Sequence, residues 1–396
     1  MRKLLSLENL TLLAIVLGFT AGVLIPEAVE NLKLLGDVFL SLLKMIIVPL
    51  VFTSVFVAII GIGSLRKFGD MGVKTLVYYT ATTGLSVVVG LILVNLIDPG
   101  KGAEVDIPAS GEVRVESLTF EDIIWNIIPS NPVRSFTEGK VLQIIFFAVL
   151  LGLAVLTVSR DKVEHIKGLF EGLNEGLINL TRWVVKLTPL GVFALVSYMV
   201  ATAGVEVFLS LWEYALTVVL GLLIHAFLIL PILAFTLGRY NPYSYLRKVR
   251  EAPLLAFSTA SSAATLPVSM QVAEEKGGVR RETAGFVLPL GATVNMDGTA
   301  LYESVAVVFI ANLYGVDLSL PQMVMIFLTA TLASIGAAAI PGAGLVMLAL
   351  VLSSVGVPLE GIGVIIAVDR FLDMLRTAVN VWGDLNGAKI IDRFVK

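Results

Sequence analysis

Long apolar runs dominate the hydrophobic pattern of this chain, and they are continuous rather than alternating at every second residue. In windows of about 19 residues, the pattern predicts membrane helices over residues 8–25, 34–61, 72–97, 140–158, 180–203 and 208–237. Strands of a membrane barrel would alternate apolar and polar residues instead. The first run is expected to be a retained helix rather than a signal peptide, because no convincing small-residue cleavage site follows it.

The pattern changes after residue 241, where small polar residues and prolines interrupt the apolar runs. "FSTASSAATLPVSM" at 257–270 and "ASIGAAAIPGAGLVM" at 333–347 each lie midway through a segment of roughly 30 residues, too short to cross a membrane twice as full helices. Broken backbone at membrane depth is tolerated only where protein buries it or a cavity borders it. The pattern therefore predicts two re-entrant helical hairpins, at about 241–276 and about 321–354.

A helix with an acidic, asparagine-containing motif is expected after each hairpin. The first, about 281–313, contains "GATVNMDGTALYES" at 291–304, and the second, about 358–391, contains "AVDRFLDMLRTAVNVWGD" at 367–384. Interrupted segments at corresponding positions of two repeats point to the binding site of a transporter. The predicted fold is an all-α integral membrane protein with eight transmembrane helices, two re-entrant hairpins and an internal repeat.

The distribution of charge predicts the orientation of these elements. Basic residues gather in "MRK", "SLRKFGD", "SRDKVEHIK", "RYNPYSYLRKVRE", "KGGVRR" and the terminal "DRFVK", whereas the connection at 98–122 is net acidic. The basic group, with both chain termini, is expected to be cytoplasmic. The first hairpin then opens to the cytoplasm and the second to the outside, so that the repeats are inverted.

Composition agrees with a membrane protein and excludes some chemistry. Hydrophobic residues make up 57% of the chain and charged residues only 15%, with a mean hydropathy of +0.92, whereas about a quarter of residues are charged in soluble proteins. The chain has no cysteine, which excludes disulfides, thiolate catalysis and iron–sulfur ligation. Its two histidines are too few for a histidine-based metal or haem site.

A single polar stripe is predicted on the helix that contains 367–384. At about 100° per residue, an arc of roughly 80° holds Asp369, Asp373, Arg376, Asn380 and Asp384, with Thr377 at its edge. Each charge at the centre of a membrane helix costs about 2.5 to 3.5 kcal/mol on insertion scales. The aspartates could simply pair with Arg376 to hold helices together. The alternative is that surplus carboxylate binds a cation, which could be a metal ion, a proton or an ammonium group.

The motif "NMDGT" places Asn295, Asp297 and Thr299 at alternate positions, a spacing that no regular helix puts on one face. Gly298 fits locally unwound backbone, whose free carbonyl groups could coordinate a hard cation. The simpler interpretation is a helix kink held by the Asn and Asp side chains.

The residue types on the stripe suggest a substrate. The planar guanidinium of Arg376 suits a carboxylate, and Asp373, one turn earlier, suits an ammonium group. Together they fit an amino acid with a second carboxylate in its side chain. The hairpin tips "TASSAA" and "IPGAG" could hold the α-carboxylate on free N–H groups, although "IPGAG" could equally be only a tight turn.

Three further sites are ambiguous from spacing alone. His225, on an apolar helix, is expected to be a packed or capped histidine rather than a proton relay. Arg370 lies at the edge of the stripe. Tyr79, Thr82 and Thr83 share one helical face, and their hydroxyls could solvate an ion or only join neighbouring helices.

The motifs "SSAATLP", "NMDGTALY", "IPGAG" and "DRFLDMLRTAVNVWGD", in this order after six spans, resemble the glutamate/aspartate transporter family of dicarboxylate/amino acid:cation symporters. The family includes archaeal aspartate transporters and neuronal excitatory amino acid transporters, and the resemblance covers about residues 8–391. It implies a homotrimer with an elevator mechanism, in which the second hairpin is the extracellular gate. Residues 1–71 and 98–203 would form the scaffold, and 72–97 with 204–396 the moving transport domain.

The resemblance also implies roles for individual residues. The substrate-binding residues would be Ser262, Thr299, Ile340, Gly344, Asp373, Arg376, Thr377 and Asn380. Of three sodium sites, one would use Gly291, Asn295, Asn380 and Asp384, and a second Thr293, Ser334, Ile335 and Ala337. The third would use Tyr79, Thr82, Thr83, Asn295 and Asp297. Ala337 replaces a common threonine, but the ligand implied there is a carbonyl group.

Two positions depart from the family pattern. Archaeal members typically have an arginine where this chain has Ala260, and animal members have one where it has Met374. The resemblance implies that this arginine tunes substrate affinity and gating, so the strength and kinetics of binding stay open for this chain.

The predicted function is a symporter of the cell membrane that imports L-aspartate and L-glutamate with sodium ions. Membrane lipids are expected around it, and neither an organic cofactor nor a nucleic acid partner is expected. Proton coupling, a C4-dicarboxylate substrate and sodium-independent substrate binding remain alternatives. A channel is disfavoured because the polar residues gather in one broken-helix repeat. An enzyme is disfavoured because no histidine or cysteine lies near the motifs to form a nucleophile–base pair.

Overall fold

A computed structural model describes residues 7–29, 32–61, 65–101, 127–203, 206–336 and 342–395. Every regular element in these ranges is helical, and none is a strand, which confirms the all-α prediction. The first half contains α1 (Leu7–Leu24), α2 (Pro26–Val29), α3 (Lys33–Gly61), α4 (Leu65–Ile97), α6 (Pro132–Glu138), α7 (Val141–Val155), α8 (Arg160–Val185) and α9 (Thr188–Ala203). The second half begins with one long helical run formed by α10 (Glu206–Ile224), the π-helix η2 (His225–Ile229), α11 (Leu230–Leu233) and the π-helix η3 (Ala234–Gly238).

The remaining elements correspond to the predicted hairpins and motif helices. They are α12 (Pro242–Val249), α13 (Glu251–Thr259), α14 (Ser262–Glu275), α15 (Arg281–Val294), α16 (Asp297–Leu313), α17 (Leu320–Ala333), η4 (Ser334–Gly336), α18 (Ala343–Val355), η5 (Leu359–Gly361) and α19 (Ile362–Phe394).

Two helices of the described ranges are long and apolar enough to cross a membrane, at Met71–Ile97 and Leu211–Gly238. Arg160–Val184 and Thr188–Thr202 would together give a third if they form one span with a bend of 51°. Large apolar side chains are exposed on the long helices, among them Leu96 at 76% and Trp212 at 71%. Such surfaces suit lipid rather than water, in agreement with a membrane protein, while the number of eight spans stays a prediction.

The segment 160–203 differs from its prediction of one helix over 180–203. It contains α8, which is amphipathic and starts within a charged stretch, followed by a break and then α9. The charged residues of α8 keep it below the hydropathy expected of a span, yet its apolar face packs on α3. Pro189, the second residue of α9, lacks the N–H that a continuous helix would need at that point, which explains the break.

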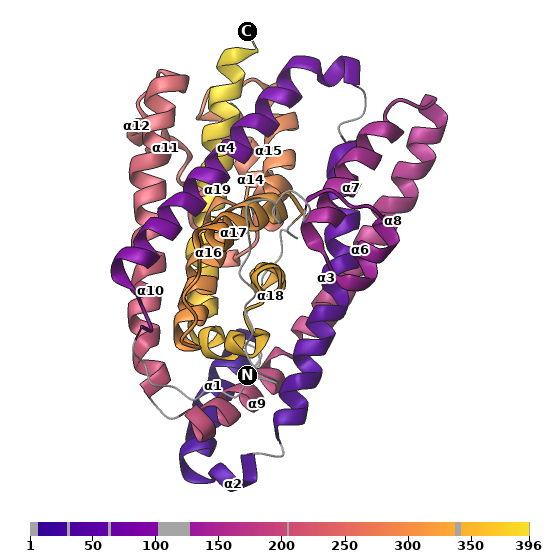
Figure 1. Ribbon diagram of the computed structural model, residues 1–396. Coiled ribbons are helices and arrows are strands. Elements are labelled where there is room, and N and C mark those ends of the chain that lie inside the picture. The colour runs from indigo at the N-terminus through magenta and orange to yellow at the C-terminus, as the bar shows by residue number, and fades with distance from the viewer. Residues whose placement is uncertain are drawn as a thin grey trace.

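The helices form two packing groups (Figure 1). In the first group α1 packs on α9, and α3 packs on α7, α8 and α9. In the second group α4 crosses α16, and α19 contacts α10, α13, α15 and α16. Since nearly every residue of α16 is buried, α16 and α19 lie at the centre of the second group.

Each predicted hairpin contains two short helices that pack on each other, α13 with α14 and α17 with α18. The first pair turns at Ala260, which has a positive φ of 48°, and the hydroxyl of Ser261 then caps α14 by accepting from the Ala264 amide. In the second pair α17 leads into η4, and the tip at residues 337–341 lies outside the described residues. Whether the two pairs re-enter the membrane stays a prediction.

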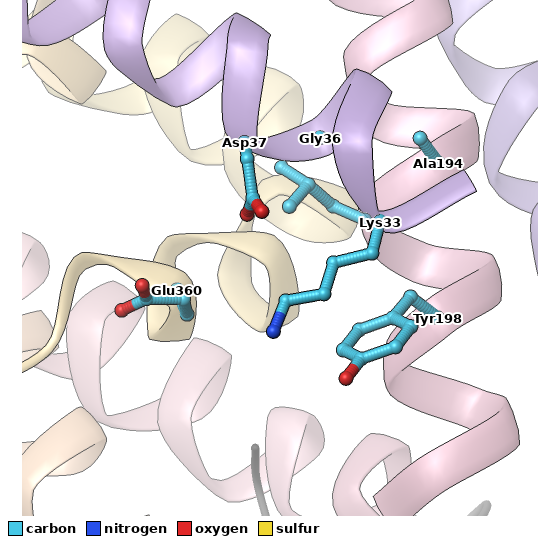
Figure 2. A pocket seen from close by; sticks show the side chains of 7 residues that line it. Lys33, Gly36, Asp37, Ala194, Tyr198 and Glu360 are labelled. Atoms are coloured by element: carbon cyan, nitrogen blue, oxygen red, sulfur yellow. The ribbon is translucent and has the colours of Figure 1, made fainter. Parts of the chain in front are cut away.

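A small cavity lies where α3, α9 and η5 meet (Figure 2). Its volume of about 20 Å³ is enough for one water molecule but not for an amino acid. The Lys33 ammonium lies 5.5 Å from the ring centre of Tyr198, and Glu360 lies on the opposite side of the ammonium in Figure 2. The cavity therefore lies between η5 and the helices α3 and α9 of the first group. It is too small to be the candidate substrate site.

Candidate functional site

The helix break predicted in "NMDGT" lies between α15 and α16. Asn295 and Met296 leave the helical conformation, with φ/ψ of −94°/90° and −114°/50°, and α16 begins at Asp297. The expectation that Gly298 marks unwound backbone was wrong, because Gly298 belongs to the first turn of α16. A Cβ atom on Gly298 would lie 2.6 Å from the carbonyl oxygen of Arg376, so this glycine allows α16 to approach α19 closely.

The polar stripe of α19 is buried along its whole length. Each of its five main residues is less than a tenth exposed: Asp369, Asp373, Arg376, Asn380 and Asp384. Because burial of charge without a partner is costly, the partners of each side chain show what the stripe can bind.

Arg376 is the centre of the first cluster, which we call the arginine cluster and which contains Asp369, Asp373, Arg376 and Tyr302. Its Nη1 donates to Asp369 Oδ1 and its Nη2 to Asp373 Oδ1, both at 3.0 Å. The guanidinium carbon lies 3.7 Å from the ring centre of Tyr302, within the range of a cation–π contact. Internal pairing of Arg376, one of the two interpretations of the stripe, is therefore present.

The start of α18, in the second predicted hairpin, contacts the arginine cluster. The Gly342 amide donates to Asp373 Oδ2 at 3.2 Å. A Cβ atom on Gly344 would lie 3.0 Å from Arg376 Nη2, so the absence of a side chain there leaves room at the guanidinium. Arg370 approaches the same Asp373 oxygen only to 3.8 Å and is 28% exposed, as expected for a residue at the edge of the stripe.

Asn380 connects the stripe to the start of α16. Its Oδ1 accepts from the Gly298 amide at 2.7 Å, and its Nδ2 donates to the Thr299 hydroxyl at 3.3 Å. Thr377, one turn earlier, donates within its own helix to the Asp373 carbonyl. Asn380 thus bonds the backbone of the broken helix at the point between the two acidic parts of the stripe.

The second cluster, which we call the carboxylate cluster, contains Asp297, Asp384, Asn295, Thr82, Thr83 and His225. Asn295 joins two of its parts, because its Nδ2 donates to Asp384 Oδ1 at 3.0 Å and its Oδ1 accepts from Thr82 at 3.2 Å. A Cβ atom on Gly291 would lie 2.6 Å from Asp384 Oδ1 and 2.5 Å from the Tyr79 hydroxyl. Glycine at this position therefore lets the backbone of α15 approach both groups.

Asp297 is held from two sides by neighbouring helices. Its Oδ1 accepts from Thr83 of α4 at 2.8 Å, and its Oδ2 lies 2.9 Å from Nε2 of His225. Tyr79, on the same face of α4, donates instead to the Val287 carbonyl. Within the described ranges no lysine or arginine forms an ion pair with Asp297 or Asp384.

The other predicted site residues have no hydrogen bond to either cluster among the described contacts, or lie outside the described residues. Ser262 is buried in the first turn of α14, which packs on α19. Ser334 and Ile335 form η4 against α15, but the Thr293 hydroxyl is exposed and donates to the Leu290 carbonyl of its own helix. Ile340 and Ala337 lie outside the described residues.

Sequence reasoning missed four buried side chains at the site. Tyr302 stacks on Arg376, and Ser86 donates to the Asp297 carbonyl at 2.8 Å. Glu303 is buried beside Tyr302 on α16, and its Oε2 has no hydrogen-bond partner among the described residues. His225 was expected to be merely packed or capped, but its partner is Asp297. Their contacts join segments far apart in the chain, although an acidic residue inside a predicted span was a signal for Glu303.

The atoms of the carboxylate cluster that could coordinate a cation are carboxylate, amide and hydroxyl oxygens. Among the described residues, no group of three or more histidine, aspartate or glutamate side chains could hold a metal ion by itself. Oxygen ligands of mixed kind suit a hard cation, and helix breaks with free carbonyls are where transporters coordinate sodium. The arrangement can therefore offer oxygen ligands and uncompensated negative charge to a small cation.

Comparison with known proteins agrees with this geometry. Residues 7–394 match the model of the sodium:dicarboxylate symporter family. The chain is 34% identical over 395 residues to a proton/sodium-glutamate symport protein of Geobacillus stearothermophilus, which covers 96% of this chain and 93% of the relative. It is 37% identical over 372 residues to the proton/glutamate-aspartate symporter of Escherichia coli K12, with 91% and 84% covered. It is 36% identical over 450 aligned positions to human excitatory amino acid transporter 2, with 97% and 78% covered. The chain belongs to the sodium:dicarboxylate symporter family, a family of transporters rather than enzymes.

Proposed function

We propose that this protein is a secondary active symporter that imports L-aspartate and L-glutamate together with sodium ions. The observation that carries the proposal is the arrangement of two buried clusters along one face of α19, with Asn380 between them. One cluster has a guanidinium with carboxylates, and the other has carboxylates with which no described lysine or arginine pairs. An acidic amino acid and a cation are the ligands that these two clusters complement.

At the arginine cluster the substrate exchanges one set of ionic contacts for another. Arg376 donates to two aspartates, and a side-chain carboxylate of the substrate would take the place of one of them. Asp373, released from Arg376, would then accept from the substrate ammonium. The amide of Gly342 and the hydroxyl of Thr299 lie close enough to Asp373 and Asn380 to orient the remaining polar groups.

At the carboxylate cluster sodium would compensate the negative charge. We assign one site to Asp384, Asn380, Asn295 and the Gly291 carbonyl, and another to Asp297, Asn295, Thr82, Thr83 and Tyr79. A third, at Thr293 with the backbone of Ser334, Ile335 and Ala337, is the least supported by contacts, because the Thr293 hydroxyl is exposed.

Coupling follows from the contacts that the two clusters share. Sodium at Asp384 would fix Asn295 and Asn380, and Asn380 holds the first turn of α16 through the Gly298 amide. That turn carries Thr299 toward the substrate. Sodium would therefore favour the arrangement in which the substrate fits, and the substrate must favour sodium binding by the same factor.

For the transport step we propose an elevator movement in a homotrimer. The packing supports this division, because α4 and the helices from α10 onward form one group and α1, α3 and α6 to α9 the other. The first group, with both clusters, would be the moving transport domain, and the second the scaffold. The second hairpin, in which the start of α18 contacts Arg376 and Asp373, would be the gate on the outside.

Proton coupling is the second candidate, and Glu303 is the observation that favours it. Its buried carboxyl group lies on the helix turn next to Tyr302 and has an oxygen without a partner among the described residues. A carboxyl group inside a membrane domain is suited to carry a proton. The names of two relatives, from Geobacillus stearothermophilus and Escherichia coli, include a proton as coupling ion.

Two measurements separate these possibilities. Calorimetric titration with L-aspartate, in the presence and absence of sodium, should give a much higher affinity with sodium. Uptake into proteoliposomes should then follow an imposed sodium gradient. Equal affinity in both buffers would refute obligatory coupled binding, and uptake driven only by a proton gradient would replace sodium symport by proton symport.

A further inference from the structure

His225 is buried against the carboxylate cluster and contacts the acidic residue at its centre. Both side chains of the His225–Asp297 pair are completely buried, and Nε2 lies 2.9 Å from Oδ2. The two residues are 72 positions apart in the sequence. A histidine that merely filled space on an apolar helix would not need this partner.

The local backbone directs His225 toward Asp297. The helix changes from α10 to the π-helix η2 at His225, where the Leu230 amide donates to the His225 carbonyl, five residues back. The π-turn precedes Pro231, which has no N–H to donate to the Phe227 carbonyl. Tyr243 donates to that carbonyl instead, at 2.9 Å. Single π-turns within helices are frequent at functional sites.

A second helix holds the π-turn in place. The indole Nε1–H of Trp382 on α19 donates to the carbonyl of Ala226 at 3.0 Å. Gly383, the next residue of α19, has no side chain, and a Cβ atom there would lie 3.0 Å from Asp297 Oδ2. The histidine, the π-turn and the acidic residue are therefore fixed relative to the helix that carries Asp384.

The hydrogen-bond chemistry defines the form of the ring. An ionised carboxylate only accepts, so Nε2 must donate. The other ring nitrogen, Nδ1, is buried with no partner among the described residues. The geometry therefore places the proton shared with Asp297 on Nε2.

We propose that His225 is a positioning residue for the cation at Asp297. Its Nε2–H donates to Oδ2 while Thr83 donates to Oδ1, so that the carboxylate plane is fixed before the cation arrives. Carboxylates that bind metal ions are themselves hydrogen-bonded, and loss of such partners typically reduces metal affinity 10- to 100-fold. His225 thus sets the affinity for sodium rather than the affinity for the amino acid.

This inference rests on the proposed function, because it requires that Asp297 is a sodium ligand. Direct binding of radiolabelled ²²Na⁺ to the purified protein, without amino acid, tests it separately from transport. His225→Leu removes the donor, and His225→Gln retains a neutral N–H donor of similar reach. His165→Leu is the matched control, since His165 is the other histidine and bonds only to the Asp161 carbonyl on its own helix.

We expect His225→Leu to weaken ²²Na⁺ binding at least tenfold, and His225→Gln to stay within about threefold of the parent. His165→Leu should not differ from the parent. L-aspartate affinity measured at saturating sodium should be unchanged in all three variants. If the leucine variant does not fold, His225→Asn takes its place, because its amide is too short to reach Asp297 and should show the same loss.

Three results would overturn the inference. They are equal sodium affinity in the leucine and parent proteins, equal loss in the leucine and glutamine variants, and loss of L-aspartate binding at saturating sodium with an unchanged melting temperature. If the parent also shows sodium-driven uptake, these results leave the proposed function standing. A parent that binds no sodium would overturn both.

Discussion

The arginine cluster and the carboxylate cluster lie on the same face of α19, but they compensate charge in opposite ways. Arg376 bonds to Asp369 and Asp373, so its positive charge has partners within the chain. Among the described residues, the Asp297 and Asp384 side chains bond to a histidine and to hydroxyl and amide groups, with no lysine or arginine. In the first cluster one guanidinium offsets part of the charge of two carboxylates, whereas in the second no guanidinium or ammonium group does so.

This difference shows how one helix can bind two kinds of ligand in sequence. A cluster with its own ion pairs can only exchange them, and it therefore selects a ligand that brings both a carboxylate and an ammonium group. A cluster with surplus carboxylate attracts any small cation that fits its oxygens. Because Asn380 bonds to the start of α16, which also lies against Arg376, occupation of one cluster would change the geometry of the other.

The largest expected effect comes from removal of the guanidinium. Arg376→Cys should weaken L-aspartate binding at least about 100-fold, because breaking a buried charge pair costs about 3–5 kcal/mol and every 1.4 kcal/mol is about tenfold in affinity. Without the guanidinium the site no longer selects a side-chain carboxylate, so the preference for L-aspartate over L-serine and L-alanine, measured alongside by calorimetry, should fall.

Arg370→Cys is the matched control for this experiment, since Arg370 lies on the same helix and approaches Asp373 only to 3.8 Å. Its effect should stay below about tenfold. Unchanged L-aspartate affinity in Arg376→Cys would contradict the assignment of the arginine cluster to the substrate.

The next effect concerns the charge of the carboxylate cluster. Asp384→Asn keeps the shape of the side chain but removes one negative charge, and we expect the sodium concentration for half-maximal L-aspartate binding to rise at least about tenfold. Asp392→Asn is the control, because Asp392 is on the same helix but pairs with Arg280 and Thr283. An identical sodium requirement in Asp384→Asn and the parent would show that Asp384 does not compensate a cation.

A smaller effect, on the affinity of both clusters, is expected when volume is added where α16 contacts α19. In Gly298→Ala the new methyl group would lie 2.6 Å from the Arg376 carbonyl oxygen and would push α16 from α19. Overpacking of this kind costs about 1–3 kcal/mol, so the melting temperature should fall, and sodium and L-aspartate affinity should decrease in parallel. Gly285→Ala, where a Cβ atom meets nothing within 4 Å, should have neither effect. Loss of one affinity alone would argue against shared spacing.

The smallest expected effect is confined to the arginine cluster. Tyr302→Leu removes the ring that lies 3.7 Å from the guanidinium carbon of Arg376. A desolvated cation–π contact contributes up to about 2 kcal/mol, so L-aspartate affinity should fall about 3- to 30-fold while sodium binding without amino acid stays unchanged. Tyr302→Phe retains the ring and should bind L-aspartate nearly as the parent does. A parallel loss in the leucine and phenylalanine variants would assign the role to the hydroxyl group instead.

Much of the architecture was predictable because it depends on local pattern. The positions of α3, α4 and the run from α10 to η3 follow from continuous apolar sequence. A break within "NMDGT" was expected because no regular helix puts its alternate polar residues on one face, although the break lies at Asn295 and Met296 rather than at Gly298. The stripe on α19 was predictable because a helix repeats every 3.6 residues. The full extent of α8 was not predictable, because α8 is a charged helix with one apolar face. That face is buried by packing on α3, which lies far away in the sequence.

The amino-acid sequence by itself determined that this chain is an all-helical member of a membrane transporter family, and which acidic and basic residues share one face of its last helix. The helical class depends on hydropathy, the family on the resemblance of short motifs, and the shared face on helical period, all of which are local. Only the tertiary structure decided how the charges are shared: that Arg376 is paired within the chain and stacked on Tyr302, that Gly298 is needed for close packing, and that His225 bonds to Asp297. The physical reason is that the partner of a buried charge is set by the packing of helices distant in sequence, which no local period contains.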